Sequence, residues 1–230
     1  MASVVVGWAP GGWHVERRRG PAAAHHGRPL PEEPTRAVWI HEVDRPALVL
    51  GSTQDDTSID RGVAAALGIE LVRRHSGGGA VLLVPGEVAW LDVILPAGDV
   101  LWEDDVSRAS HWLGQMWRSA LADLGVGGAT VHDGSLACGP LGRVVCFGAI
   151  GPGEVLVGVR KVVGISQRRT RVAARFQCAV YRTWAPDLLA RLLRLDDEQE
   201  AVLDRAVLEV RATPAEMVAA FLDHLPDLDS

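Results

Sequence analysis

The sequence predicts an α+β fold in which helices pack on a mixed β-sheet. The first observation is the order of patterns along the chain: short apolar strands, one long amphipathic helix, further strands, and a helical C-terminal part. The second is the composition, because 48% hydrophobic and 23% charged residues are typical of globular proteins. Strands and helices that come in separate runs favour an α+β architecture.

The N-terminal part, residues 1–36, is expected to form a strand or an arm. Residues 17–35 mix Arg, Pro and paired His without periodicity, which indicates a solvated arm or loop rather than a metal site. His25 and His26 are adjacent, so their side chains diverge on any regular element.

Short strands are expected next. Residues 37–43 and 47–52 are predicted to form a hairpin. A helix capped by Ser58 or Asp60 follows and ends at Gly68. Three further strands, separated by Gly and Pro, are expected over 69–74, 80–84 and 88–96.

The long helix is predicted over residues 103–124, where apolar side chains recur every three or four positions and Gly125 follows. Residues 133–143 are rich in Gly and Pro, which indicates a surface loop over a site. Four more strands are expected over 144–150, 154–158, 161–169 and 175–182.

The C-terminal part, residues 186–230, is expected to be a helical tail packed on the main domain, residues 37–185. It divides into two or three segments. Pro214 stands at a first-turn position, and Met217 and Phe221 share one face.

Composition excludes several classes of function. A formal net charge of -6 implies no broad basic face for nucleic acid. No apolar run is long enough to cross a bilayer, so no membrane partner and a cytoplasmic protein are expected. The cysteines, Cys138, Cys146 and Cys178, form no C-x-x-C pair, which argues against a zinc knuckle and against a disulfide framework. The histidines have no metal-ligand spacing.

The segment RRHSGGGAV, residues 73–81, places two arginines before three consecutive glycines. Glycines without Cβ atoms allow the backbone to lie against a ligand and point its N–H groups at an anion. Arg73 and Arg74 would add bidentate donors for the same anion. The alternative is a flexible hairpin loop with two solvated arginines.

Lys161 is the only lysine in a chain that has 22 arginines. It stands in RKVVGISQRRTR, residues 160–171, within a predicted strand. A compact ammonium can contact a carbonyl and a phosphoryl oxygen together, where the bulkier guanidinium would not fit. The alternative is an edge-strand lysine that prevents aggregation.

These two segments together resemble the lipoate-protein ligase family, of the biotin/lipoate ligase superfamily that includes octanoyltransferases. RRHSGGGAV is similar to its Arg-Arg-x-Ser/Thr-Gly-Gly-Gly-Ala-Val signature, RKVVGISQRRTR to its Lys-x-x-Gly-x-Ala/Ser segment, and PALVLGSTQ to an early strand. The Gly-Arg-Gly-Arg loop of the biotin branch is missing. The resemblance therefore implies the biotin/lipoate ligase catalytic fold over residues 37–185 and points to lipoate or octanoate.

The resemblance implies an ATP-dependent reaction with Mg²⁺, in which an acyl-adenylate forms and the acyl group passes to a lysine of a lipoyl domain. The acceptor would be the glycine cleavage H protein or a 2-oxoacid dehydrogenase subunit. Lys161 would be the catalytic residue and would bind the mixed anhydride of the acyl-adenylate between its carbonyl and its phosphate. The residues implied to bind the adenylate and the acyl group are Arg73, Arg74, Ser76, Gly77, Gly78, Gly79, Ala80, Gly164 and Ser166.

The chain also departs from the ligase pattern. After Ala80-Val81 the family continues with a His-Asp pair and a Gly-Asn pair, whereas here Gly86 is followed by Glu87. An acid near a phosphate repels it unless a metal or an arginine intervenes.

Two alternatives to the ATP-dependent ligase stay open. Cys146-Phe147 resembles the nucleophile position of one octanoyltransferase branch, which needs no ATP and takes its acyl group from an acyl-carrier protein; Lys161 or Arg160 would favour the thiolate. Against this, most free cysteines are small buried hydrophobes. The other alternative is a non-catalytic protein that binds lipoate or its adenylate.

Overall fold

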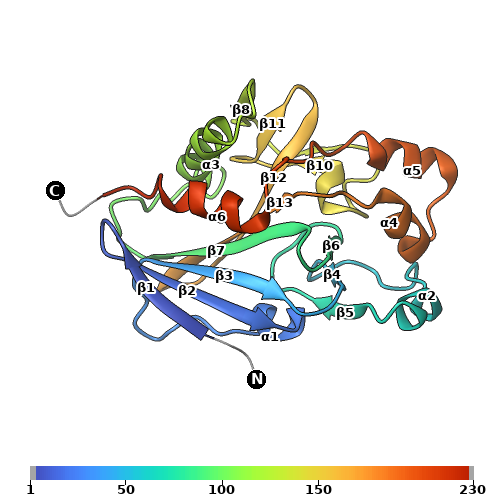
Figure 1. Cartoon of the computed structure of the whole chain (residues 1–230), viewed down its shortest axis with the longest axis horizontal. Coiled ribbons are helices and arrows are strands. Elements are labelled where there is room, and N and C mark those ends of the chain that lie inside the picture. The colour runs from blue at the N-terminus through green and yellow to red at the C-terminus, as the bar shows by residue number, and fades with distance from the viewer. Residues whose placement is uncertain (1–3, 228–230) are drawn as a thin grey trace.

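The computed structural model describes residues 4–227, whose strands form an eight-stranded sheet, a three-stranded sheet and a two-stranded ribbon, with helices packed around them (Figure 1). The predicted α+β fold is confirmed. No helix of these residues is long and apolar enough to cross a membrane. The division of the chain at residues 36 and 185 stays a prediction.

The eight-stranded sheet is antiparallel except where β2 pairs with β3. Its strands in spatial order are β1 (Val4–Ala9), β2 (Trp13–Gly20), β3 (Ala37–Val43), β7 (Val88–Pro96), β13 (Ala173–Tyr181), β12 (Arg160–Arg169), β11 (Val155–Val157) and β8 (Ala129–Val131). A strand or an arm was expected within residues 1–36, and β1 and β2 lie there. β8 was not expected from the sequence; it lies at an edge of the sheet, where fewer neighbours impose an apolar pattern.

The three-stranded sheet has the order β5 (Glu70–Arg73), β4 (Ala47–Leu50), β6 (Val81–Leu83). The predicted hairpin of residues 37–43 with 47–52 is therefore wrong. Both edges of β3 are already occupied by β2 and β7, so β4 can pair only elsewhere. The helix predicted next is confirmed as α2 (Arg61–Ala66), whose first turn is capped by the Asp60 side chain.

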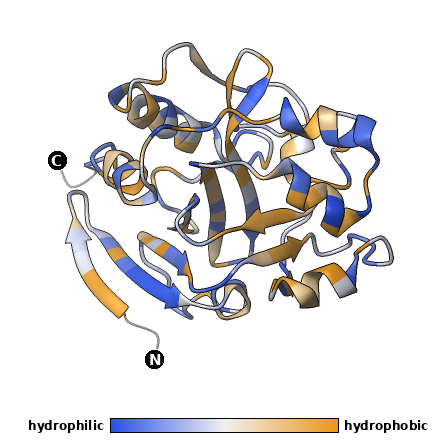
Figure 2. Cartoon of the chain, turned by 45° about the vertical axis from the view of Figure 1, so that its right-hand side comes forward, coloured by the Kyte–Doolittle hydropathy of each residue, from blue (hydrophilic) through white to orange (hydrophobic). Residues whose placement is uncertain are grey.

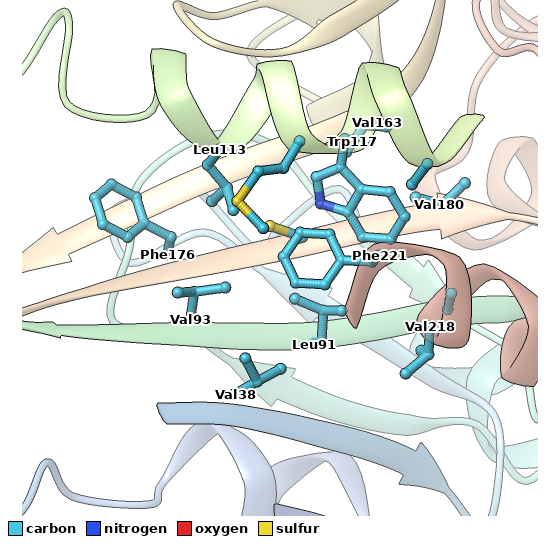
Figure 3. Packing of buried hydrophobic residues seen from close by; sticks show 14 of the residues in the cluster. Val38, Leu91, Val93, Leu113, Trp117, Val163, Phe176, Val180, Val218 and Phe221 are labelled. Atoms are coloured by element: carbon cyan, nitrogen blue, oxygen red, sulfur yellow. The ribbon is translucent and has the colours of Figure 1, made fainter. Parts of the chain in front are cut away.

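Two helices, α3 (His111–Asp123) and α6 (Pro214–Leu222), cover one face of the large sheet (Figure 1). Trp117 of α3 and Phe221 of α6 lie with ring centroids 4.6 Å apart, and Figure 3 shows both above Leu91 of β7. Alternate residues of a strand point to opposite faces, so Leu91 belongs to this cluster while Trp90 belongs to the cluster on the other side.

The opposite face of the large sheet packs against the three-stranded sheet and α4 (Pro186–Leu193), with α5 (Asp197–Asp204) beyond. Figure 2 shows hydrophobic residues concentrated in the strands at the centre of the molecule, whereas the helices carry both kinds of residue. The site described below lies between the two sheets. The predicted helical tail is confirmed as three helices, and α6 begins with Pro214 after a capping box formed by Thr213 and Glu216.

The solvated arm predicted for residues 17–35 is wrong over its first part. Residues 17–20 belong to β2, and α1 (Ala22–His26) follows, with His25 and His26 buried. The helix is anchored by the Glu70 side chain, which accepts hydrogen bonds from the N–H groups of Ala22 and Ala23. The N-cap residue of α1, Pro21, makes no side-chain hydrogen bond, so the local sequence contains no capping signal that would predict this helix.

Two further expectations are corrected. The long helix begins at His111 rather than at residue 103, because the Asp105 side chain accepts the N–H of Ser107 and closes a turn there. The strand predicted over residues 144–150 is instead a 3-10 turn (Cys146–Gly148) followed by the short β10 (Ala149–Ile150), which pairs with β9 (Ala137–Cys138).

Candidate active site

The three glycines between β5 and β6 allow the loop to lie against another segment of the chain. A Cβ on Gly79 would lie 2.6 Å from the backbone N of Val145, and Gly78 has a φ of +95°. Both positions therefore require glycine. Gly77 differs, because a Cβ there would meet nothing within 4 Å. These glycines were predicted to lie against a ligand, whereas Gly79 lies against the backbone of Val145.

Cys146 lies where the glycine loop and Lys161 meet. Its backbone N–H donates to the carbonyl of Ala80 at 2.9 Å, and its own carbonyl accepts a hydrogen bond from Lys161 Nζ at 3.0 Å. The side chain is half-buried, and a Cβ built on Gly78 would be 4.0 Å from Cys146 Sγ. The two motifs found in the sequence thus converge on one cysteine.

Lys161 is buried, with only 2% of its surface exposed. It is in β12, between β11 and β13, so the edge-strand interpretation is wrong. Its Nζ lies 2.6 Å from Glu154 Oε2 and 5.1 Å from the centre of the Phe147 ring. A buried ammonium needs such a counter-charge, because an isolated charge is strongly disfavoured away from water.

Glu154 was not predicted to have a role. Besides Lys161, its carboxylate accepts the N–H groups of Gly151 at 2.6 Å and Ile165 at 3.1 Å. The carboxylate thus joins the turn before β11 to β12 and to the lysine. Its only sequence signal was its position after the Gly151-Pro152-Gly153 turn.

The two arginines hold the loops of the site. Arg73 Nη1 donates to the carbonyls of Gly51 at 2.8 Å and Gln54 at 2.7 Å. Arg74 Nη2 donates to those of Gly77 at 2.8 Å and Gly79 at 3.0 Å. The Nε of Arg74 is buried without a partner in the described chain. The expected contacts of these arginines with an anion stay a prediction.

A pocket between the two sheets opens beside Cys146. One wall comes from the large sheet and the other from β4, β6 and the 3-10 turn. Lys161 is not among the lining residues and reaches the site through Cys146 and Phe147. The lining residues are His26, Val49, Arg74, Val81, Leu83, Trp90, Cys146, Phe147, Gly164, Ser166, Gln177, Cys178 and Ala179.

Two of the predicted residues in β12 shape this pocket. A Cβ on Gly164 would lie 2.9 Å from Phe147 Cζ, so glycine leaves room for the ring. Ser166 Oγ is 3.2 Å from Ser76 Oγ, which also donates to Gln177 Oε1 at 3.2 Å. The predicted Ser76 and Ser166 therefore form one hydrogen-bonded wall.

A buried ionic network supports that wall. Asp92 accepts hydrogen bonds from Arg175 Nε at 2.7 Å and from Gln177 Nε2 at 3.3 Å, and lies 2.9 Å from His41 Nε2. Burial alone would raise the pKa of Asp92, but the charge of Arg175 and the contact with His41 hold this pKa well below its ordinary value. The carboxylate is therefore ionised and can only accept hydrogen bonds.

His25 and His26 were predicted to diverge, yet both rings are buried and both contact Trp90. The His26 ring stacks on Trp90 with centroids 4.6 Å apart, and the His25 ring lies 4.6 Å from that of His41. Burial lowers the pKa of His26 to about 3 and that of His25 to about 4. Both rings are therefore neutral at physiological pH.

The other cysteines are less suited to chemistry at this pocket. Cys178 is fully buried, and burial raises the pKa of its thiol far above the physiological range. Cys138 is exposed in β9. Within residues 4–227, no three His, Cys, Asp or Glu side chains gather as metal ligands would.

The structure brings most of the predicted residues together. Arg74, Cys146, Gly164 and Ser166 line the pocket, while Gly78 and Ala80 lie beside Cys146. Besides Glu154, sequence reasoning missed His26, Trp90 and Gln177. The signal for Gln177 was available, because a polar residue at an inward position of a buried strand needs partners. The chemical roles of the predicted residues stay predictions.

Comparisons with known proteins identify the fold and the family. The model of the lipoyl protein ligase A/B catalytic domain matches residues 23–225. A putative lipoate protein ligase from T. acidophilum with bound lipoic acid has a TM-score of 0.63 at 17% identity, covering 87% of this chain and 75% of that one. A lipoate-protein ligase A bound with ATP has a TM-score of 0.63 at 18% identity, with the same coverage of 87% and 75%.

A third structure, a bi-partite lipoate protein ligase from Thermoplasma acidophilum with its E2 lipoyl domain, has a TM-score of 0.64 at 16% identity and covers 87% of this chain and 73% of that one. No curated protein matches the sequence. At these identities the structural matches establish the fold. The family model covers every strand from β3 onward and the lining of the pocket, and the resemblance noted in the sequence is thereby confirmed: the chain belongs to the lipoyl protein ligase A/B catalytic domain family.

Proposed function

We propose that this chain transfers a lipoyl or octanoyl group to a lysine of a lipoyl domain, and that Cys146 carries the acyl group during the transfer. One observation carries the proposal: the backbone of Cys146 is held on one side by Ala80 and on the other by Lys161, with Sγ beside Gly78 at a largely apolar pocket. The catalytic domain family supports a ligase or transferase.

The reaction has two steps. The Cys146 thiolate attacks the carbonyl carbon of an acyl thioester on a carrier protein, and the carrier leaves as a thiolate that takes up a proton. The neutral amine of the acceptor lysine then attacks the Cys146 thioester. An amide forms, the C–S bond breaks, and the proton lost by the amine returns the cysteine to its thiol form.

Lys161 has a positioning role in this proposal. Glu154 balances its charge, and the buried ammonium holds the Cys146 carbonyl in place. A fixed backbone keeps Sγ at the mouth of the pocket, and holding the nucleophile near the substrate carbonyl is a main source of rate enhancement.

The proposed acceptor is a lipoyl domain, of the glycine cleavage H protein or of a 2-oxoacid dehydrogenase subunit. The similarity to a lipoate ligase whose structure was determined with its E2 lipoyl domain supports this acceptor. An acyl-carrier protein is the proposed donor, and a cytoplasmic location is part of the proposal.

The second candidate is the ATP-dependent ligase expected from the sequence. The unpartnered Nε of Arg74 and the open space at Gly77 favour it, because both would suit an adenylate. The nucleotide would bring Mg²⁺, held mainly by phosphate oxygens and water. The two arginines fit a nucleotide only in part. Their Nη atoms donate to backbone carbonyls, and these hydrogen bonds would have to break before the same atoms could bind a phosphate.

One pair of assays separates the candidates. Wild-type protein is incubated with octanoyl-carrier protein and a lipoyl domain, and both proteins are followed by intact-mass spectrometry. We expect a hydroxylamine-labile octanoyl adduct on the enzyme and a stable one on the lipoyl domain. Cys146→Ala should lose both adducts, whereas Cys138→Ala, the matched control at an exposed cysteine, should keep them.

The second assay is ATP–pyrophosphate exchange with lipoate or octanoate. Exchange that survives in Cys146→Ala, together with no transfer from the carrier protein, would replace the proposal with the ligase. Binding of lipoate without either activity would mark a non-catalytic binding protein.

A further inference from the structure

The acyl pocket crosses the large sheet from β12 to β7. Gly164 of β12 pairs with Ala179 of β13, which in turn pairs with Trp90 of β7. Neighbouring strands are about 4.8 Å apart, so Trp90 lies about 10 Å from Gly164 across the sheet. Phe147, next to Cys146, packs on Gly164. Trp90 therefore marks the end of the pocket far from the cysteine, at about the reach of an extended octanoyl chain.

His26 closes this far end. Its ring stacks on Trp90 with an interplanar angle of 27°, and both side chains line the pocket with Leu83. The side chains of Leu83 and Trp90 beside it are apolar, and the other polar side chains of the wall are Arg74, Ser166 and Gln177. A polar ring at the position reached by the tail of an acyl chain needs an explanation.

The hydrogen bonds around His26 determine which of its nitrogens carries the proton. The ionised Asp92 can only accept, so the Gln177 side-chain atom 3.3 Å from it is the amide nitrogen. That same Nε2 lies 3.4 Å from His26 Nδ1. Nδ1 therefore accepts a hydrogen bond, and the proton of the neutral ring is on Nε2.

The Nε2–H group of His26 has no hydrogen-bond partner among residues 4–227. It is thus a neutral donor on the β7 side of the pocket that Cys146 also lines. A saturated chain would cover this donor without bonding to it, which is unfavourable for a buried N–H. A chain with an oxygen or sulfur acceptor at its tail would bond to it.

We propose that His26 selects acyl groups that carry a hydrogen-bond acceptor at the end far from the carboxyl carbon, in preference to the saturated octanoyl chain. This inference rests on the proposed function, since it names the substrate class of the same pocket. A lipoyl group, with ring sulfurs near its tail, meets the requirement weakly, and a chain with a distal carbonyl oxygen meets it well.

The test compares two thioesters of the same small thiol and of equal chain length, one of octanoic acid and one ending in a methyl ketone. A lipoyl domain is the acceptor, and kcat/KM is measured for each. We expect wild-type protein to prefer the keto chain by about tenfold, the usual cost of leaving one buried donor unpaired. Equal kcat/KM values, or a preference for octanoyl, would overturn the inference.

Two variants locate the effect. His26→Phe keeps an aromatic ring on Trp90 but removes the N–H, so it should lose the preference for the keto chain. His25→Phe is the matched control, because His25 is buried in the same helix but does not line the pocket. A preference that persists in His26→Phe would also refute the role of His26.

A binding measurement separates this inference from the proposed function. Calorimetry on Cys146→Ala with the two free acids needs no transfer chemistry, and the keto acid should bind about tenfold more tightly. If the keto acid binds more tightly but wild-type protein transfers no acyl group, the proposed function is refuted and the selection by His26 stands. Transfer with no discrimination between the chains would refute only the selection by His26.

Discussion

The ammonium of Lys161 and the carboxylate of Glu154 lie 2.6 Å apart, and their side chains are only 2% and 4% exposed. Both groups have further partners, since Lys161 also bonds to the Cys146 carbonyl and Glu154 to the N–H groups of Gly151 and Ile165. The pair therefore joins the 3-10 turn that carries the cysteine to β12 and to the turn before β11.

Neutralising Glu154 should destabilise the protein. Glu154→Gln leaves the Lys161 charge buried without its counter-charge, which costs about 3–5 kcal/mol in the free energy of unfolding. Urea unfolding followed by circular dichroism measures the change. Glu42→Gln removes the exposed pair of Glu42 with Arg17 and should cost less than about 1 kcal/mol. Equal effects of the two substitutions would contradict the importance assigned to the buried pair.

Arginine should not replace the single lysine. In Lys161→Arg the planar guanidinium must fit a closed space shaped for an ammonium that contacts Glu154 and the Cys146 carbonyl together. We expect the rate of octanoyl transfer to fall by at least about 100-fold, as it should in Lys161→Met. Single-turnover formation of the acyl-enzyme is the measurement. Near wild-type activity of Lys161→Arg would show that any buried cation suffices.

The glycine loop offers a matched pair of substitutions. Gly79→Ala would place a Cβ 2.6 Å from the backbone of Val145, which cannot move as a flexible side chain would. Its expected cost is about 3 kcal/mol in the free energy of unfolding. Gly77→Ala has open space around the new methyl group and should change that free energy by less than about 0.5 kcal/mol. Thermal and urea unfolding of both variants would test the contrast.

The sequence predicted the parts of the fold that local patterns encode. β7 and β13 alternate between two buried faces, and α2 and α6 begin at capping residues, so each could be recognised from its own residues. The strands that pair with β3 and β4 could not be predicted from the sequence, because strand pairing depends on which edges are free in the assembled sheet. The short α1 was missed for the related reason that Glu70, distant in sequence, anchors it.

The site divides in the same way. Lys161 and the triglycine were found because a single lysine and three consecutive glycines are unusual in this composition. Glu154 and His26 were missed, since one acid in a turn and one histidine beside another carry no unusual pattern. Their significance comes from burial and from contacts with distant residues, which only the folded chain creates.

The two buried histidines should make the stability of the protein depend on pH. Below pH 6.5 an unfolded chain protonates His25 and His26, whereas burial lowers the pKa of His25 to about 4 and that of His26 to about 3 in the folded state. The unfolded state then binds more protons, so acid favours unfolding. The contribution of the two neutral rings to the free energy of unfolding is therefore complete above pH 6.5, and it declines as the pH falls toward 4.

Urea unfolding between pH 4.5 and pH 8 should show this decline as a slope of about 1.4 kcal/mol per pH unit for each histidine, since one pH unit corresponds to that energy per proton. Replacing either ring by Phe should remove its share of the slope, because Phe cannot take up a proton in the unfolded chain. The slope of each Phe variant is compared with that of wild-type protein. A packing change that is independent of pH alters the absolute free energy of unfolding but not this slope. A His26→Phe variant with the full wild-type slope would mean that the His26 ring binds its proton equally in both states, and its burial in the neutral form would have to be abandoned.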